Sequence, residues 1–137
     1  RLINTKIKNS IKSGLKVIFC IGETLKEKKN KKTNQILSKQ IMNGLKSIKN
    51  KTNIIIAYEP VWSIGTGLIP NSKDLFNSIS FIKSKFSKKS PKILYGGSVN
   101  GNNISQLKNI STIDGFLIGG ASQDPKKFID IIKKTYI

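Results

Sequence analysis

Apolar residues along the chain follow two spacings, one typical of helices and one typical of buried strands. In four stretches they recur three or four positions apart, which is the period of an amphipathic helix. These stretches predict helices over residues 2–13, 33–49, 71–86 and 125–136. The first of them places Ile3, Ile7 and Ile11 on one face and stops at Gly14.

Capping residues support the two C-terminal helices. Asn71 is a plausible N-cap with Asp74 three residues later, and Asp124 precedes Pro125, which suits a first helical turn. The apolar stripe of the last helix is expected to face the core with Phe128, Ile132 and Tyr136.

Short apolar runs between these helices predict strands. They cover residues 16–21, 53–58, 92–95 and part of the segment "IDGFLIGG" at 113–120. A first helix followed by four strand–helix units indicates an α/β fold with right-handed crossovers and a parallel sheet. All strands then end on one side, where ligands bind in such folds.

One carboxylate and several glycines gather at those strand ends. Glu59 follows the run "NIIIAY" in the segment "AYEPVWSIGTG", and Glu23, Gly96 to Ser98 and Gly119 to Gly120 end the other strands. Glycines there let backbone N–H groups approach a ligand, and such a cluster favours an anion such as phosphate. Each glycine pair alone is equally explained by the steric needs of a turn.

Length, composition and charge limit the number of domains and the classes of partner. The chain has 137 residues, is 37% hydrophobic, and carries a net charge of +18 from 25 Lys plus Arg against 7 Asp plus Glu. This length fits one domain with a real core. The charge invites a nucleic-acid hypothesis, but the lysines are scattered and nucleotide bias also produces a Lys-, Ile- and Asn-rich chain. The run from Lys26 to Lys32 is most simply a solvated loop and helix start.

The numbers of cysteine and histidine residues argue against a thiol nucleophile and a metal site. The single cysteine, Cys20, lies in "KVIFCIG" and is expected to be a small buried hydrophobe, since a nucleophilic thiol needs a base and the chain has no histidine. One Cys and no His cannot form a metal cluster. Without a signal peptide or a long apolar run, we expect a cytoplasmic protein with no membrane partner. The start at Arg1 suggests an N-terminus elsewhere.

Four motifs carry a resemblance to triosephosphate isomerase. "CIGET" at 20–24, "AYEPVWSIGTG" at 57–67, "YGGSVNGNN" at 95–103 and "DGFLIGGAS" at 114–122 match motifs of that family in order and at similar spacing. The resemblance covers nearly the whole chain. It implies the C-terminal half of a parallel (β/α)8 TIM barrel, strands five to eight, with residues 1–137 forming one partial domain.

The resemblance also implies roles for particular residues. Glu59 would be the base that moves a proton between the carbons of dihydroxyacetone phosphate and glyceraldehyde 3-phosphate, a step of glycolysis and gluconeogenesis. The phosphate would be held by Gly65, Ser98, Gly119 and Gly120. A mobile lid would consist of Pro60, Val61, Trp62, Ser63, Ile64, Gly65, Thr66 and Gly67. The family needs no metal or organic cofactor, and its complete members are expected to be homodimers.

Two departures from the family matter. Leu68 to Pro70 replaces the usual lid hinge, so a closed-lid hydrogen bond to Tyr95 is expected to be missing or shifted. The family's histidine electrophile, with an asparagine and a lysine, belongs to a first half that is not in this chain. A non-catalytic phosphate-binding half-barrel is therefore the alternative, and a nucleic-acid binder comes third.

A half-barrel is also expected to leave apolar inner-face residues partly exposed. These are Ile54, Ile56, Ile93 and Leu117.

Overall fold

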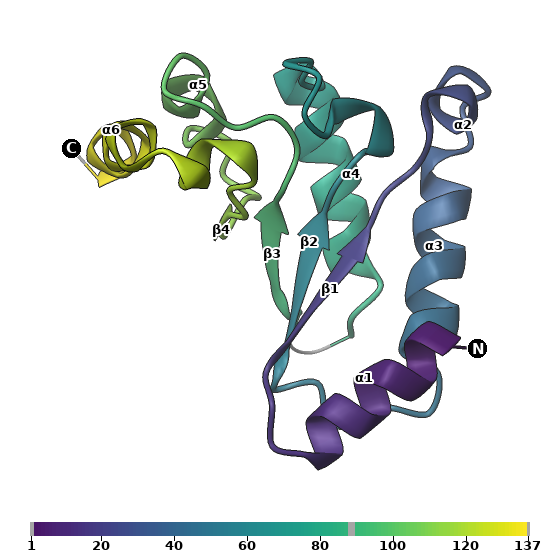
Figure 1. The fold of residues 1–137 in the computed structure, drawn as a ribbon. Helices are drawn as coiled ribbons and strands as arrows, with labels where there is room; N and C mark the ends of the chain where they lie inside the picture. Colours follow the sequence, from purple (N-terminus) through teal and green to yellow (C-terminus); the bar gives the residue numbers. More distant parts are fainter. Residues whose placement is uncertain (1, 88–89, 137) are drawn as a thin grey trace.

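The computed structural model describes residues 2–87 and 90–136. Its elements are α1 (Leu2–Lys12), β1 (Val17–Ile21), α2 (Leu25–Lys29), α3 (Thr33–Gly44), β2 (Ile54–Tyr58), η1 (Val61–Ser63), α4 (Ser72–Ser84), β3 (Lys92–Tyr95), α5 (Ile104–Leu107), β4 (Gly115–Phe116), η2 (Gly120–Gln123) and α6 (Pro125–Tyr136). The strands form one parallel sheet in the order β1-β2-β3-β4, and their carboxyl ends share one edge (Figure 1). The predicted parallel α/β fold is confirmed.

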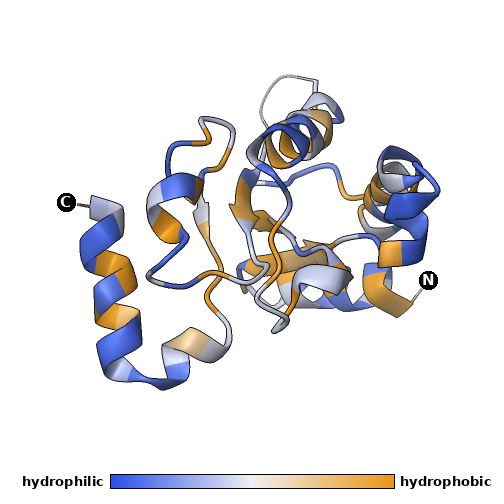
Figure 2. Ribbon diagram, turned by 90° about the horizontal axis from the view of Figure 1, so that it is seen from above, coloured by the Kyte–Doolittle hydropathy of each residue, from blue (hydrophilic) through white to orange (hydrophobic). Residues whose placement is uncertain are grey.

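One face of the sheet packs against α3 and α4 (Figure 2). Alternate residues of β1, β2 and β3 point to this face, because side chains in a strand change sides at every residue. Ile56 of β2 pairs in register with Phe19 of β1 and Ile93 of β3, and all three side chains are buried. The helices contribute Leu37, Ile41, Leu75, Ile79 and Ile82 to the same core.

The opposite face of the sheet is open. Ile18 is 46% exposed, and Ile55 and Leu94 on the neighbouring strands are partly exposed. The expectation that Ile54, Ile56 and Ile93 would be exposed is wrong by one position in the strand: these three side chains face α3 and α4. Of the residues expected to be exposed, Leu117 is partly so.

Cys20 lies on the open face and is exposed, so its expected burial is wrong. It is two residues from Ile18 and therefore points to the same side. The run "KVIFCIG" is apolar on both sides, and sequence periodicity alone does not show which side the helices cover.

Two helical predictions need adjustment near α2 and α3. The helix expected over 33–49 ends at Gly44, and Ser47 takes a left-handed conformation with φ of 61°. The lysine-rich run after Thr24 contains α2, which begins with a capping box between Thr24 and Glu27. A strong local cap thus forms a separate short helix in the run that was predicted to be a solvated loop and helix start.

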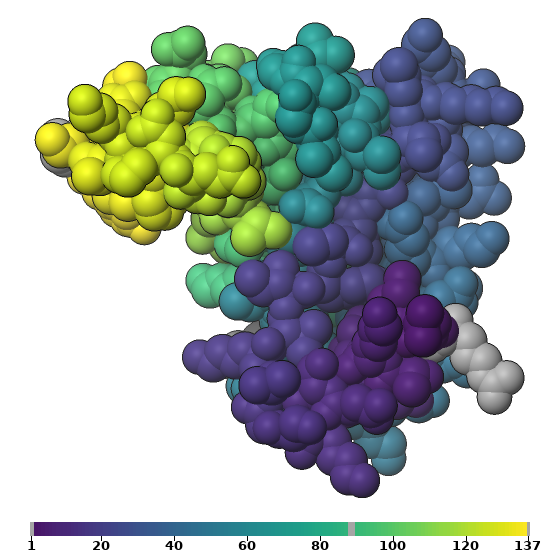
Figure 3. All heavy atoms as spheres, viewed as in Figure 1, coloured from purple at the N-terminus to yellow at the C-terminus, as the bar shows by residue number. Residues whose placement is uncertain are grey.

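The outer helices bury less of their apolar stripes than predicted. In α6, the expected inward residues Phe128, Ile132 and Tyr136 are exposed, and Ile131 is the buried one. Only Ile7 is fully buried in α1, and Ile3 is 58% exposed. The helix α6 packs on α5 and η2 beyond the short strand β4, and α1 and α6 stand at opposite corners of the molecule (Figure 3).

Among the described residues, none of the helices combines the length and apolar character needed to cross a membrane. The four-residue helix α5 was not predicted, because one turn is too short to show a helical period.

The two faces of the sheet should respond differently to the same substitution. Ile56→Ala removes a side chain that is completely buried and should lower the free energy of unfolding by about 2–5 kcal/mol. Ile18→Ala, on the open face, should cost about 1 kcal/mol or less. Urea unfolding followed by circular dichroism measures both. Equal losses would contradict the assignment of the open face.

Candidate active site

Glu59 stands directly after β2, at the carboxyl edge of the sheet. Its N–H donates to the carbonyl of Ile21 over 2.8 Å, which extends the pairing with β1 by one residue. On the other side, its carboxylate side chain lies over Gly96: a Cβ added to Gly96 would be 2.5 Å from Glu59 Oε1 and 2.7 Å from Cγ. The neighbouring strand β1 therefore fixes the backbone of Glu59, and the end of β3 leaves space for its side chain.

Gly96 thus makes room for a carboxylate rather than offering its N–H to a ligand. That N–H donates to the carbonyl of Tyr58 over 3.0 Å and is already used by the sheet. Gly22 at the end of β1 has a similar steric role, because a side chain there would strike the backbone of Glu59. The amide of Gln40 on α3 holds Gly22 by hydrogen bonds to its N–H (3.0 Å) and its carbonyl (2.9 Å). Sequence reasoning missed Gln40.

The thiol of Cys20, on strand β1, is a neighbour of the Glu59 carboxylate. Partial burial, the negative charge of Glu59 and a hydrogen bond to it raise the pKa of Cys20 to about 11. The residue reaches the surface, but surrounding atoms screen part of its thiol from water. Cys20 is therefore a thiol at neutral pH rather than a nucleophilic thiolate, as the lack of histidine had predicted.

Alkylation of Cys20 should be slow because of this raised pKa. At pH 8 we expect iodoacetamide to react roughly 100-fold more slowly than with an unperturbed thiol, since the thiolate is the nucleophile. Glu59→Gln should speed the reaction several-fold by removing the negative charge, while Glu27→Gln should not. Mass spectrometry of time points gives the rates. A Glu59→Gln rate equal to that of the unmodified protein would mean that the two groups do not interact.

Glu23, at the end of β1, is completely buried and fully engaged. Its carboxylate accepts hydrogen bonds from the Tyr58 hydroxyl (3.1 Å) and from the indole N–H of Trp62 (3.1 Å). Burial, with the charge of Glu23, raises the pKa of Tyr58 well above its usual range, so the hydroxyl stays a donor. Glu23 therefore anchors the entrance of segment 60–67 and is not free to exchange protons with a ligand.

The segment 60–67, predicted to be a lid, leaves the sheet as η1 and then becomes exposed. Gly65 and Gly67 adopt φ angles of 68° and 79°, in the left-handed region that favours glycine. Ser98 joins this segment to the end of β3: its hydroxyl donates to the Ser63 carbonyl over 2.6 Å and accepts from the Gly67 N–H over 2.9 Å. Ser98 is thus hydrogen-bonded to residues on both sides of Gly65, the other residue of the predicted phosphate site in this part of the structure.

The hydroxyl of Tyr95 pairs with segment 60–67 through Ser63. The two hydroxyl oxygens are 2.9 Å apart in a buried position, and Ser63 also donates to the Leu68 carbonyl over 2.6 Å. Burial raises the pKa of Tyr95. The tyrosine therefore has a side-chain partner, Ser63, which sequence reasoning did not assign to it, and the departure at Leu68 to Pro70 leaves this link intact.

Gly119 and Gly120 lie farther along the same edge. The N–H of Leu117 donates to the Tyr95 carbonyl over 3.0 Å, so the two glycines follow the end of the β3–β4 pairing. Both are exposed, and both have open space where a side chain would stand. Their role in a phosphate site stays a prediction.

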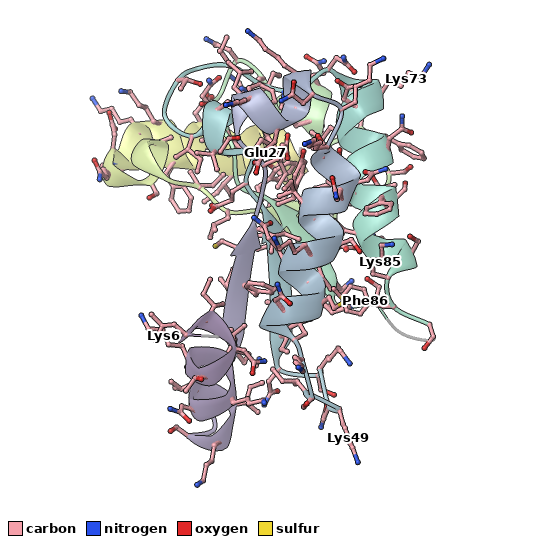
Figure 4. All side chains as sticks on the ribbon, turned by 90° about the vertical axis from the view of Figure 1, so that its right-hand side faces the viewer. Lys6, Glu27, Lys49, Lys73, Lys85 and Phe86 are labelled. Atoms are coloured by element: carbon pink, nitrogen blue, oxygen red, sulfur yellow. The ribbon has the colours of Figure 1, made fainter. Side chains whose placement is uncertain are left out.

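A large hollow of the molecule lies away from these residues. It has a volume of about 700 Å³ and is lined by apolar residues of α3 and by lysines at the amino-terminal ends of the strands. In Figure 4, Lys49, which lines this hollow, is at the opposite end of the molecule from Glu27 of α2, and Lys85 and Phe86 are at the end of α4 away from Lys73. Within 2–87 and 90–136, no group of His, Cys, Asp and Glu could hold a metal ion.

A protein-family model and several curated proteins match this chain. The family model described as triosephosphate isomerase matches residues 1–135. The chain is 46% identical over 138 residues to the triosephosphate isomerase of Thermodesulfovibrio yellowstonii, covering 96% of this chain and 56% of that protein. It is 45% identical to that of Saccharomyces cerevisiae and 43% identical to that of Mycoplasmoides gallisepticum, each time over 96% of this chain and 56% of the relative.

The chain therefore spans about half the length of the curated relatives it matches. The match runs through all four motifs and all four strands of the sheet. The chain belongs to the triosephosphate isomerase family.

Proposed function

We propose that residues 1–137 are the C-terminal half, strands five to eight, of the (β/α)8 barrel of a triosephosphate isomerase, forming one partial domain. Two observations support this placement. Four parallel strands end on one edge with an open face, as half of a closed barrel requires. The motifs at 20–24, 57–67, 95–103 and 114–122 also occur in the order of the family's second half.

In this proposal Glu59 is the catalytic base. It removes a carbon-bound proton from dihydroxyacetone phosphate and returns it to the neighbouring carbon through an enediolate. The observation that carries the assignment is the position of its carboxylate over Gly96 at the carboxyl edge of the sheet, where barrel enzymes place their chemistry. Glu23 is excluded from this role because Tyr58 and Trp62 occupy its oxygens.

The other proposed roles follow the predicted lid and phosphate site. Residues 60–67 close over the phosphate and exclude water, so that the enediolate does not lose its phosphate. Gly65, Ser98, Gly119 and Gly120 bind the phosphate through backbone N–H groups. The Ser98 N–H donates to Ser63 Oγ over 3.3 Å in this structure, so it exchanges that partner for the phosphate. No cofactor takes part. We further propose a homodimer acting in the cytoplasm, with a phosphorylated triose as its partner and neither nucleic acid nor a membrane.

A non-catalytic phosphate-binding half-barrel is the second candidate. It is favoured by one observation: the chain contains no histidine and so lacks the electrophile of the family. The encoding reading frame separates the two, since a catalytic protein must continue upstream into a strand-end lysine and a "GHSE"-like segment.

The biochemical test uses the full-length protein from such a reading frame. Isomerisation of dihydroxyacetone phosphate in deuterium oxide should place deuterium on the carbon next to the new carbonyl, because the base exchanges its proton with solvent. Binding of glycerol 3-phosphate without isomerisation or exchange would favour the non-catalytic module.

A further inference from the structure

Lys28 of α2 contacts one residue inside segment 60–67 and one residue that follows it. Its Nζ lies 4.8 Å from the centroid of the Trp62 ring and 3.0 Å from Oδ2 of Asp74. Trp62 belongs to η1 at the entrance of this segment. Asp74 belongs to the first turn of α4, which begins five residues after Gly67 and is fixed by a hydrogen bond from the Asp74 N–H to Asn71.

The indole of Trp62 is contacted at its edge and on one face by residues of the same short stretch of chain. Glu23 accepts the indole N–H at the ring edge, and Lys28 places its cation over the ring face. The capping box between Thr24 and Glu27 lies between these two residues and sets the direction of α2. A cation over an indole face is attractive, so Lys28 favours the ring position seen here.

We infer that Lys28 is a positioning residue for the lid: it couples the entrance of segment 60–67, at Trp62, to its exit, at Asp74. This inference rests on the proposed function, because segment 60–67 is a lid only if it closes over a substrate. Lys28 itself is not a catalytic residue, since it contacts lid and helix residues rather than reacting atoms.

The expected effect of losing Lys28 is small, because its contacts are partly exposed to solvent. The Lys28 and Asp74 side chains are 31% and 47% exposed, and partly exposed ion pairs and cation–π contacts are individually weak. Losing both contacts should change the population of the productive lid position by about 3–10-fold. Because the lid contacts phosphate in the proposed function, the loss should appear mainly in KM.

The test compares Lys28→Met, Lys28→Arg and Lys29→Met in the full-length protein. Methionine keeps an unbranched stem and removes the charge, arginine restores a cation, and Lys29 is an exposed neighbour on the same helix. Trp62 is the only tryptophan of the chain. In protein labelled with 5-fluorotryptophan, its ¹⁹F resonance is identified by its loss in Trp62→Phe.

Lys28→Met should shift the Trp62 resonance and raise KM about 3–10-fold with a smaller change in kcat. Lys28→Arg should restore both, and Lys29→Met should change neither. Asp74→Asn tests the other contact and should also raise KM. Unchanged KM in Lys28→Met, or an equal effect of Lys29→Met, would overturn the inference. Failure of the proposed function would give a different result, because the unsubstituted protein would then not isomerise the substrate. The ¹⁹F spectra with and without glycerol 3-phosphate would still show whether Lys28 positions Trp62.

Discussion

Glu59→Gln is expected to lower kcat for isomerisation by about 10²–10⁴-fold in the full-length protein. Glutamine has nearly the shape of glutamate and fits the space over Gly96, but its amide cannot accept a proton from carbon. The proposed phosphate contacts come from backbone N–H groups and are not altered by the substitution. Affinity for glycerol 3-phosphate should therefore change little, and calorimetry can measure it beside the rate.

A matched carboxylate serves as the control for this substitution. Glu27→Gln removes a charge from the same edge of the sheet, but Glu27 caps α2 through Thr24 and has no proposed contact with substrate. Its kcat should remain within about twofold of the unsubstituted value, with a modest loss of stability. Near-normal turnover in Glu59→Gln would remove Glu59 from its role, whatever Glu27→Gln does. An unchanged midpoint of urea unfolding in Glu59→Gln would show that the protein is still folded.

The main elements were predictable because each combines a clear apolar period with a local cap or stop. The helix after Asn71 is an example: its N-cap hydrogen bond to Asp74 is present and Leu75, Ile79 and Ile82 are completely buried. The strand ending at Tyr95 has the predicted bounds. Such local signals do not depend on the rest of the fold.

The errors concern features that depend on tertiary packing. All residues of "NIIIAY" from Ile54 to Ala57 are apolar, so alternation could not show that Ile56 faces the helices while Ile55 faces the open side. For α6, an apolar stripe predicted a buried face, but its extent depends on β4, which is only two residues long.

Within the candidate site, sequence placed Glu59 at a strand end but not the residues that surround it. The sequence predicts that the N–H of Gly96 approaches a ligand, whereas this N–H pairs with the carbonyl of Tyr58 and the missing side chain leaves space for Glu59. The Ser63–Tyr95 pair joins residues 32 positions apart, and no sequence spacing indicates it. The acid Glu23 in "CIGET" and the indole of Trp62 in "VWS" are an acceptor and a donor, and this pairing of types could have suggested their hydrogen bond.

The 137 residues by themselves are expected to show no isomerase activity above background. Proton abstraction by Glu59 places negative charge on a substrate oxygen, and the chain has no histidine to stabilise that charge. Loss of such a donor commonly costs about 10²–10³-fold in kcat, and the proposal places the family's histidine, asparagine and lysine together in the missing half.

The same chain should also self-associate. The open face leaves Ile18 exposed and Ile55 and Leu94 partly exposed, at about 25 cal/mol per Å² of apolar surface left in water. Strand β1 is an edge whose outer backbone groups can pair with another chain. Light scattering should therefore give a mass above that of the 15.2 kDa monomer.

Adding the N-terminal half of a related enzyme to the 137 residues tests both expectations together. If it covers the open face and supplies the absent electrophile, self-association should fall and isomerisation should appear together, because both defects arise from the same missing strands. Glu59→Gln in the added mixture should abolish the recovered activity without reversing the change in mass. Substantial isomerisation by the 137 residues alone would overturn the proposal, since the catalytic set would then be complete without the other half.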